Sequence, residues 1–212
     1  MGECDTDVFR SCDTSIVSDA LDEHGIDGVI TGLEPVGRRQ TLVGRAHTIR
    51  LERTPTPGSE TNFPYAMLEE LVADRVLVLE GVGPELSCWG GNASRLAANA
   101  GAEGIVIDGG YRDVGEIRNG AFPVFGRAPT PKTGQRRIAV DAVGEPVEIG
   151  GVEVAPDDLL VADATGVVAV PADVVPAVAA TAETILEEER AVERKIDAGV
   201  SVSTLERDDH QF

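Results

Sequence analysis

The stretch from Trp89 to Gly120 constrains the fold of this chain more than any other part of the sequence. It reads WGGNASRLAANAGAEGIVIDGGYRDVGEIRNG, which predicts a glycine turn, a helix, a short buried strand, a polar turn and a second helix. The apolar face of the first helix is predicted at Ala93, Leu96, Ala97 and Ala100. The apolar run 104–107 predicts a strand, and this strand is expected to end at Asp108 and the two glycines that follow it. Residues 111–113 should therefore lie in a loop between a strand and a helix, where chemistry is commonly located.

The turn Gly90-Gly91-Asn92 comes directly before the first helix and is a candidate anion site. The first N–H groups of a helix have no acceptor within it, and the helix dipole adds partial positive charge there. A carboxylate or a phosphate suits this position, and Arg112 could supply a second, bidentate contact to the same anion. Alternatively, the glycines form an ordinary turn and Arg112 forms a surface ion pair, which contributes little to stability.

Asp113 and Glu116 lie one helical turn apart, so both carboxylates can face one point. A hard cation such as Mg²⁺ is typically held by one or two carboxylates together with waters and substrate oxygens. An anion site, an arginine and a divalent cation would together bind a 2-oxo acid and stabilise its enolate. The same two acids also suit an N-cap followed by a capping-box glutamate, and their spacing alone leaves both interpretations open. The sequence contains no GxGxxG, P-loop lysine or HExxH motif.

Three segments, 89–90 (WG), 104–113 (GIVIDGGYRD) and 120–125 (GAFPVF), resemble the RraA-like family. This family includes the regulator of ribonuclease activity A and the 4-hydroxy-4-methyl-2-oxoglutarate/4-carboxy-4-hydroxy-2-oxoadipate aldolases. In its enzymes, a glycine or an aspartate is followed after twenty residues by Arg-Asp, and then after two more residues by an acid. In this chain these positions are Gly91, Arg112-Asp113 and Glu116. Further matches extend the resemblance over most of residues 14–199: SDAL (18–21), VGRA (43–46) and DATGVVAVP (163–171).

The resemblance implies a divalent-metal-dependent lyase on 2-oxo acids, a class II-type pyruvate aldolase with oxaloacetate decarboxylase activity. It assigns Arg112 and Asp113 as catalytic residues. Asp113 would ligate Mg²⁺ or Mn²⁺, Glu116 would hold a metal-bound water, and Arg112 would contact the pyruvyl group. The family's namesake implies the alternative, a non-catalytic regulator that binds a ribonuclease or an RNA helicase. Retention of all three side chains favours the lyase, because a pure binding module has no need of a metal site.

The resemblance also implies that backbone amides hold the substrate carboxylate, at Gly90, Gly91, Asn92 and Ala93. One of these positions departs from the named aldolases, which have an aspartate where this chain has Gly91. That aspartate helps to position a catalytic water. The departure therefore bears on aldol cleavage of their substrate more than on decarboxylation.

Helices and short strands alternate along the chain, which predicts an α/β or α+β fold with a compact mixed sheet. The resemblance adds a swivelling β/β/α fold with mixed sheets between helix layers, and a homotrimer or hexamer with sites near subunit interfaces. We expect one domain over residues 13–199, a mobile N-terminus at 1–12 and a frayed C-terminal tail at 200–212.

The periodicity and the turn residues predict the individual elements. Helices are expected at 14–24, with a cap at Asp13 or Thr14 and Gly25 as the stop, at 65–71, and from a cap at Asp173 to Gly199. Strands are expected at 43–51, 75–80, 123–125, in short pieces over 138–154, and at 159–162 and 167–170. A Pro/Thr turn is expected at 54–58 and a loop at 81–87, where it would be a candidate lid over the anion site.

The net charge is −19, and only two of the 18 basic residues are lysines. Acidic charge is spread along the chain, and such a surface repels nucleic acid backbones, so we expect no nucleic acid partner. Spread acidity with scarce lysine is typical of halophilic proteins, because concentrated salt screens the self-repulsion. An ordinary acidic enzyme is the alternative.

Three widely spaced cysteines indicate a reducing compartment rather than a disulfide framework. The N-terminal residues contain no apolar segment of signal-peptide or membrane-spanning length. We therefore expect a cytoplasmic protein with no membrane partner and a small 2-oxo acid as its ligand.

Overall fold

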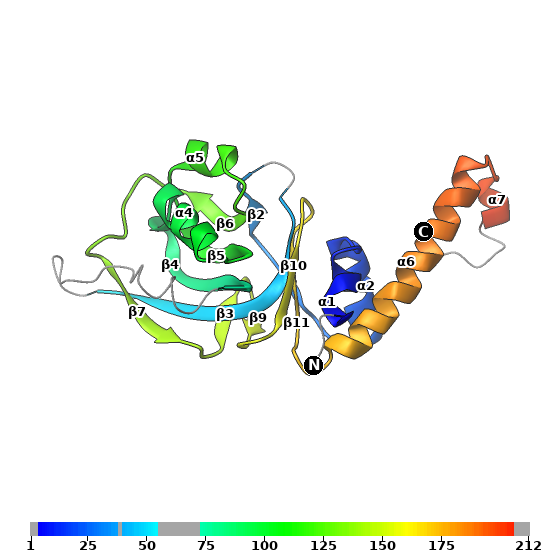
Figure 1. Ribbon diagram of the computed structural model, residues 1–212, viewed down its shortest axis with the longest axis horizontal. Helices are drawn as coiled ribbons and strands as arrows, with labels where there is room; N and C mark the ends of the chain where they lie inside the picture. Colours follow the sequence, from blue (N-terminus) through cyan, green and yellow to red (C-terminus); the bar gives the residue numbers. More distant parts are fainter. Residues whose placement is uncertain (1–3, 38–39, 55–72, 206–212) are drawn as a thin grey trace.

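The computed structural model describes residues 4–37, 40–54 and 73–205, whose strands form one nine-stranded mixed sheet and a small hairpin (Figure 1). The strands of the sheet are β1 (Val29–Ile30), β2 (Glu34–Pro35), β3 (Leu42–Arg53), β4 (Arg75–Trp89), β5 (Gly104–Tyr111), β6 (Val124–Pro129), β7 (Ile138–Val143), β10 (Leu159–Ala162) and β11 (Val167–Val170). Their spatial order is β1-β11-β10-β3-β4-β5-β6-β2, and β7 pairs with β3. The hairpin joins β8 (Val147–Ile149) to β9 (Val152–Val154).

Helices cover the sheet in two groups that lie apart from each other (Figure 1). The helices are α1 (Cys4–Phe9), α2 (Thr14–Glu23), α4 (Gly91–Asn99), α5 (Val114–Asn119), α6 (Val175–Asp197) and α7 (Val202–Leu205). One apolar core joins α4 and α5 to β4 and β5, and another joins α1, α2 and α6 to β10 and β11. A third core lies between the sheet and the β8–β9 hairpin. The expected mixed α/β fold, with sheet between helix layers, is therefore confirmed.

The centre of the sheet is parallel, since β3, β4, β5 and β6 run in the same direction. The apolar run of β5 is completely buried on both faces, as parallel strands commonly are. Ile105 and Ile107 face the core under α4, whereas Val106 faces the core under the β8–β9 hairpin. Because β4 and β5 end side by side, the two helices that follow them begin at the same edge of the sheet.

Both central strands are longer than their sequence predicts. β5 continues beyond Asp108 to Tyr111, and β4 continues through residues 81–87, where a loop and candidate lid were expected. The glycines do not end β5, because they allow its backbone to approach β4: a Cβ at Gly110 would lie 2.5 Å from the Leu86 carbonyl oxygen. The two strands stay paired through three register shifts. The lid expectation is therefore wrong, since these residues belong to the sheet.

The ends of the domain also differ from expectation. Phe9 was expected in a mobile N-terminus, but it is completely buried in α1 against the core under α2 and α6. Leu205, expected in a frayed tail, is 2% exposed in α7. Asp173 does not cap α6, whose N-cap is Val174 and has no side-chain capping bond. Each terminal segment is packed because it supplies a large apolar side chain to the protein interior.

Other local predictions are confirmed. Asp13 caps α2, its Oδ1 accepting the Ile16 N–H at 3.0 Å, and Gly25 follows the helix with φ +67°. The predicted pair of short strands is the antiparallel β10–β11 ladder. The predicted helix 65–71 and most of the turn at 54–58 lie outside the described residues. None of the described helices has the length and apolar character that a membrane span requires.

Candidate functional site

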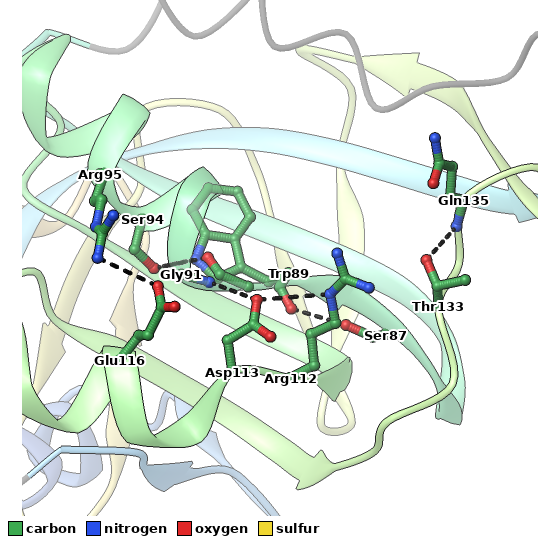
Figure 2. Close-up of polar contacts among 11 residues, drawn as sticks. Ser87, Trp89, Gly91, Ser94, Arg95, Arg112, Asp113, Glu116, Thr133 and Gln135 are labelled. Carbon is green, nitrogen blue, oxygen red and sulfur yellow. Dashed lines mark hydrogen bonds and ion pairs between the residues drawn. The ribbon is translucent and has the colours of Figure 1, made fainter.

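The candidate site lies at the edge of the sheet where β4 and β5 end and α4 and α5 begin (Figure 2). Trp89, the last residue of β4, pairs in register with Tyr111, the last residue of β5. The backbone N–H of Arg112 then donates to the Trp89 carbonyl at 3.0 Å, which links the loop after β5 to the start of α4. The parallel sheet thus brings two distant parts of the predicted stretch together.

Trp89 holds the first turn of α4 in place. Its indole Nε1 donates to Ser94 Oγ at 2.8 Å, and that hydroxyl donates to the Gly90 carbonyl at 3.2 Å. The buried ring stacks on Phe122 with 6.4 Å between centroids. A buried aromatic ring with a satisfied N–H is a rigid support, so the glycine turn has a fixed orientation.

The glycine turn is a helix N-terminus that faces the site. Gly90 is the N-cap of α4, and the first hydrogen bond within the helix runs from the Ser94 N–H to the Gly90 carbonyl at 3.0 Å. The N–H groups of Gly91, Asn92 and Ala93 precede that bond, and they carry the positive end of the helix dipole. The structure thus places the residues expected to hold a carboxylate at an anion-favouring position.

Asp113 occupies part of this position through its own side chain. Its Oδ2 accepts the Gly91 N–H at 3.1 Å and lies 3.6 Å from Arg112 Nε (Figure 2). Asp113 has the left-handed backbone φ of +58°, and its side chain makes no capping bond to α5. The capping-box interpretation of this aspartate is therefore wrong, because the carboxylate points back to the preceding helix. Aspartate is one of the few non-glycine residues that adopt this conformation readily.

Glu116 approaches the same turn from the first turn of α5. Its Oε2 lies 3.4 Å from Arg95 Nη2, across the space between α5 and α4. A Cβ at Gly91 would overlap this carboxylate, and a Cβ at Gly90 would lie 2.6 Å from Asp113 Oδ2. Because Gly90 and Gly91 have no Cβ, both carboxylates can approach the start of α4. An ordinary exposed turn would not need to leave this space for other side chains.

The two acids are accessible to solvent. The side chain of Asp113 is 39% exposed and that of Glu116 is 53% exposed, so their ion pairs add little stability. No cluster of three or more His, Cys, Asp or Glu side chains suited to a metal occurs in the described part of the chain. Asp113 and Glu116 are two carboxylates, so they could hold a cation such as Mg²⁺ only together with water and ligand oxygens.

A groove of about 470 Å³ runs beside Glu116, between α4 and α5. Arg95 and Glu116 form its charged part, and Ile117 and Phe122 contribute apolar surface.

Residues 130–134 cross the strand ends on the other side of Arg112. The Thr130 N–H donates to the Tyr111 carbonyl at 2.8 Å, and the Gly134 N–H donates to the Ser87 carbonyl at 3.0 Å.

Neither Arg95 nor Ser94 was predicted from the sequence to be part of this site. Both lie on α4, and Arg95 is one helical turn after Gly91, so helical spacing could have placed it on the same side. Its contact with Glu116 depends on how α4 packs beside α5, which no local pattern reveals. Cys88, directly before Trp89, is a packing residue: it is buried, and burial raises the pKa of its thiol.

Comparison with known proteins adds the family. The RraA-like model, described as Aldolase/RraA, matches residues 14–169. Protein DlpA of Legionella pneumophila is 28% identical over 199 residues; the match covers 93% of this chain, which spans only 32% of that longer relative. The 4-hydroxy-4-methyl-2-oxoglutarate aldolase of Thermus thermophilus is 33% identical over 139 residues, covering 64% of this chain and 79% of the relative.

A solved structure agrees with these matches. RraAS2 of Streptomyces coelicolor, described as an unusual member of the RNase ES inhibitor RraA protein family, superimposes with a TM-score of 0.81. It is 26% identical, and the match covers 91% of this chain and 97% of that one. The sequence model and the structure lead to the same assignment, and the chain belongs to the RraA-like (Aldolase/RraA) family.

Proposed function

We propose that this protein is a divalent-metal-dependent lyase that forms pyruvate from 2-oxo acids. The observation that carries the proposal is the meeting of two carboxylates and an arginine at the start of α4. Asp113 contacts the Gly91 N–H, Glu116 lies over the same glycine, and Arg112 lies beside Asp113. An aldolase among the relatives supports the same class of reaction.

Each group has a role that follows from its place. The N–H groups of Asn92 and Ala93 suit the substrate carboxylate, as helix N-termini suit anions. The Arg112 guanidinium, 46% exposed beside Asp113, suits the 2-oxo oxygen, where negative charge develops as the C–C bond breaks. Neither acid needs to be a strong base, because loss of CO₂ or cleavage of the bond itself generates the enolate.

The residues present suit a hard cation. Asp113 would hold Mg²⁺ or Mn²⁺ directly and Glu116 through water, as oxygen ligands from one or two carboxylates commonly do. When bound, the cation supplies Lewis-acid stabilisation of the charge on the 2-oxo oxygen. The exposed Asp113 and Glu116 side chains leave room for solvent and substrate oxygens in the same place.

The glycine at position 91 supports decarboxylation more than aldol cleavage. A side chain here would overlap the Glu116 carboxylate, so an aspartate could enter only if Glu116 moved away. This chain therefore lacks the acid that helps to position a catalytic water in the named aldolases. We propose decarboxylation of oxaloacetate as the activity that least depends on that acid.

A regulatory role is the second candidate, and the likeness to an RNase ES inhibitor supports it. A regulator would act through its surface, and its effect would be independent of Asp113. The lyase proposal therefore predicts that the protein's effect depends on the Asp113 carboxylate, whereas the regulatory proposal predicts that it does not.

The conversion of oxaloacetate to pyruvate tests the proposal. Turnover is measured in about 1 M KCl with EDTA, with Mg²⁺ and with Mn²⁺, each against the uncatalysed rate with the same metal. We expect turnover above that background with either cation and none with EDTA. Rates equal to background with both cations would refute decarboxylation by this protein.

A further inference from the structure

We propose that Ser94 is a positioning residue for the candidate cation site, because it fixes the peptide whose N–H binds Asp113. This inference rests on the proposed function and names the side chain that supports the proposed metal ligand. The juxtaposition that carries it is a chain of hydrogen bonds at the start of α4 (Figure 2). Its members are, in order, the Trp89 indole, the Ser94 hydroxyl, the Gly90–Gly91 peptide and the Asp113 carboxylate.

The peptide between Gly90 and Gly91 has partners at both ends. Its carbonyl accepts the Ser94 N–H at 3.0 Å and the Ser94 hydroxyl at 3.2 Å. Its N–H donates to Asp113 Oδ2 at 3.1 Å. Because a peptide unit is planar, the bonds at the carbonyl also set the direction of the N–H. Ser94 therefore influences a contact of Asp113 from the opposite side of the peptide.

The two glycines make this support necessary. A residue without a Cβ adopts many backbone conformations, so a peptide between two glycines turns more easily than other peptides. Side chains cannot stiffen the turn, since a Cβ at Gly90 would lie 2.6 Å from Asp113 Oδ2 and a Cβ at Gly91 would overlap Glu116. The orientation of this peptide therefore depends on the bonds that Ser94 makes to it.

Trp89 fixes the direction of the Ser94 hydroxyl. Both side chains are buried, with 2% of Trp89 and 6% of Ser94 exposed. The indole N–H can only donate, and it donates to Ser94 Oγ at 2.8 Å, which leaves the serine proton for the Gly90 carbonyl. Successive hydrogen bonds in a buried chain polarise one another, so the indole strengthens the bond that Ser94 makes.

Trp89 also reaches the other half of the site. Its carbonyl accepts the Ser87 hydroxyl at 2.8 Å and the Arg112 N–H at 3.0 Å. One buried residue thus fixes the loop that carries Arg112 and, through Ser94, the peptide that binds Asp113. Residues behind a metal ligand orient it, and their loss typically lowers metal affinity by about 10–100-fold. Ser94 and Trp89 occupy that place behind Asp113.

Calorimetric titration of Mn²⁺ into the full chain in about 1 M KCl tests this assignment. Ser94→Ala removes the hydroxyl, and we expect the affinity for Mn²⁺ to fall by about tenfold. Ser94→Thr keeps a hydroxyl that can reach the carbonyl four residues earlier, so it should restore most of the affinity. The matched control is Thr184→Ala, which removes the same kind of bond, from Thr184 to the Ala180 carbonyl at 3.1 Å in α6. The control should bind Mn²⁺ as the wild type does.

A second measurement uses Trp89, the single tryptophan of the chain, whose indole N–H gives one NMR resonance. Mg²⁺, which is diamagnetic, should shift this resonance in the wild type and in Ser94→Thr. It should not shift the resonance in Ser94→Ala, because the chain of bonds from the indole to Asp113 is interrupted.

Trp89→Phe removes the indole N–H and keeps an aromatic ring in the core. It should lower the affinity for Mn²⁺ less than Ser94→Ala does, since the Ser94 hydroxyl remains. The double variant should bind Mn²⁺ no more weakly than Ser94→Ala alone, because Trp89 acts through Ser94. Trp89→Phe does not depend on the stability of Ser94→Ala, so it tests the assignment separately.

Three outcomes would overturn the assignment and leave the proposed function intact. Ser94→Ala could bind Mn²⁺ within about twofold of the wild type. The losses of the two single variants could add in the double variant, which would show that the two side chains act independently. Ser94→Thr could fail to restore the affinity while Mg²⁺ leaves the wild-type indole resonance unmoved, which would show a merely structural role. A wild type that binds neither cation would instead overturn the proposed function, and this inference with it, so the two failures are distinguishable.

Discussion

Gly91 donates its backbone N–H to Asp113 Oδ2 across 3.1 Å, so the start of α4 holds the acid that begins α5. This bond gives Asp113 a partner outside its own helix and leaves α5 without a side-chain cap. It also puts a carboxylate at the place where a substrate anion is expected. This bond is the structural reason why the Asp113 carboxylate belongs to the candidate site, although Asp113 stands at the N-cap position of α5.

The first prediction concerns the charge of Asp113. Asp113→Asn keeps the size of the side chain, and asparagine tolerates the left-handed φ of +58°. We expect metal-dependent turnover to fall by about 100-fold or more, because the cation loses its direct ligand. The free energy of unfolding should change by at most about 1 kcal/mol, since the ion pair with Arg112 is exposed. Enzyme kinetics and thermal melts of the same preparation measure both quantities.

Glu116→Gln is the companion variant, and its loss should be milder because its contact with the cation runs through water. A fully active, metal-stimulated Asp113→Asn protein would contradict the site assignment. If the protein is instead a regulator, Asp113→Asn and Glu116→Gln should each inhibit a partner ribonuclease to the same extent as the wild type.

The second prediction concerns the space at Gly91. A valine here would overlap the Glu116 carboxylate and stand in front of the first amides of α4. We expect Gly91→Val to lower the affinity for pyruvate and for oxalate, measured by calorimetry with Mn²⁺, by about tenfold or more.

Gly115→Ala is the matched control, because a Cβ at that position in α5 meets nothing within 4 Å. The control should bind normally and gain up to about 1 kcal/mol of stability from better helix propensity. Unchanged affinity in Gly91→Val would show that the substrate carboxylate binds elsewhere.

The third prediction concerns a carboxylate behind the site. Asp108 receives Arg127 Nε at 2.5 Å, Arg127 Nη2 at 2.8 Å and the Gly150 N–H at 2.8 Å. Burial alone would raise the pKa of Asp108, but these hydrogen bonds outweigh it and hold the pKa below its ordinary value. The folded state therefore binds this proton less tightly than the unfolded state. The resulting stability is present above the unfolded pKa of about 3.9 and is lost as pH falls through the folded pKa.

Asp108→Asn should accordingly cost about 1.5–3 kcal/mol at pH 7 and clearly less near pH 3. Denaturant unfolding at the two pH values measures the difference. Glu153→Gln, at an exposed position of β9, is the control for simple loss of charge. A cost for Asp108→Asn that does not depend on pH would argue against this linkage.

The fourth prediction concerns salt. With a net charge of −19 and two lysines, the folded chain repels itself most strongly when screening is weak. Raising KCl from about 0.1 M to about 1 M shortens the screening length from about 10 Å to about 3 Å. We expect the melting temperature to rise steeply over this range, and stable folding only in concentrated salt. An equal or higher melting temperature at low salt would identify an ordinary acidic protein.

Much of the fold could be predicted because its information is local. The apolar spacing of α4, the Asp13 cap of α2 and the β10–β11 pair depend on neighbouring residues, and the structure confirms them. Gly91, Arg112, Asp113 and Glu116 were also identified from spacing and family resemblance. A helix turn or a glycine turn needs no distant partner, so its sequence pattern is sufficient to place it.

The tertiary structure decided what these residues touch. The glycines at 109 and 110 were expected to end β5, yet they let its backbone lie close to β4, since a glycine has no Cβ to separate two strands. Phe9 was expected to be mobile, but a core formed by α2 and α6 buries it. Arg95 pairs with Glu116, and Asp113 turns to Gly91, only because parallel strands end together and start two helices side by side. Such contacts join positions far apart in the chain, and their register is set by the whole sheet rather than by any single segment.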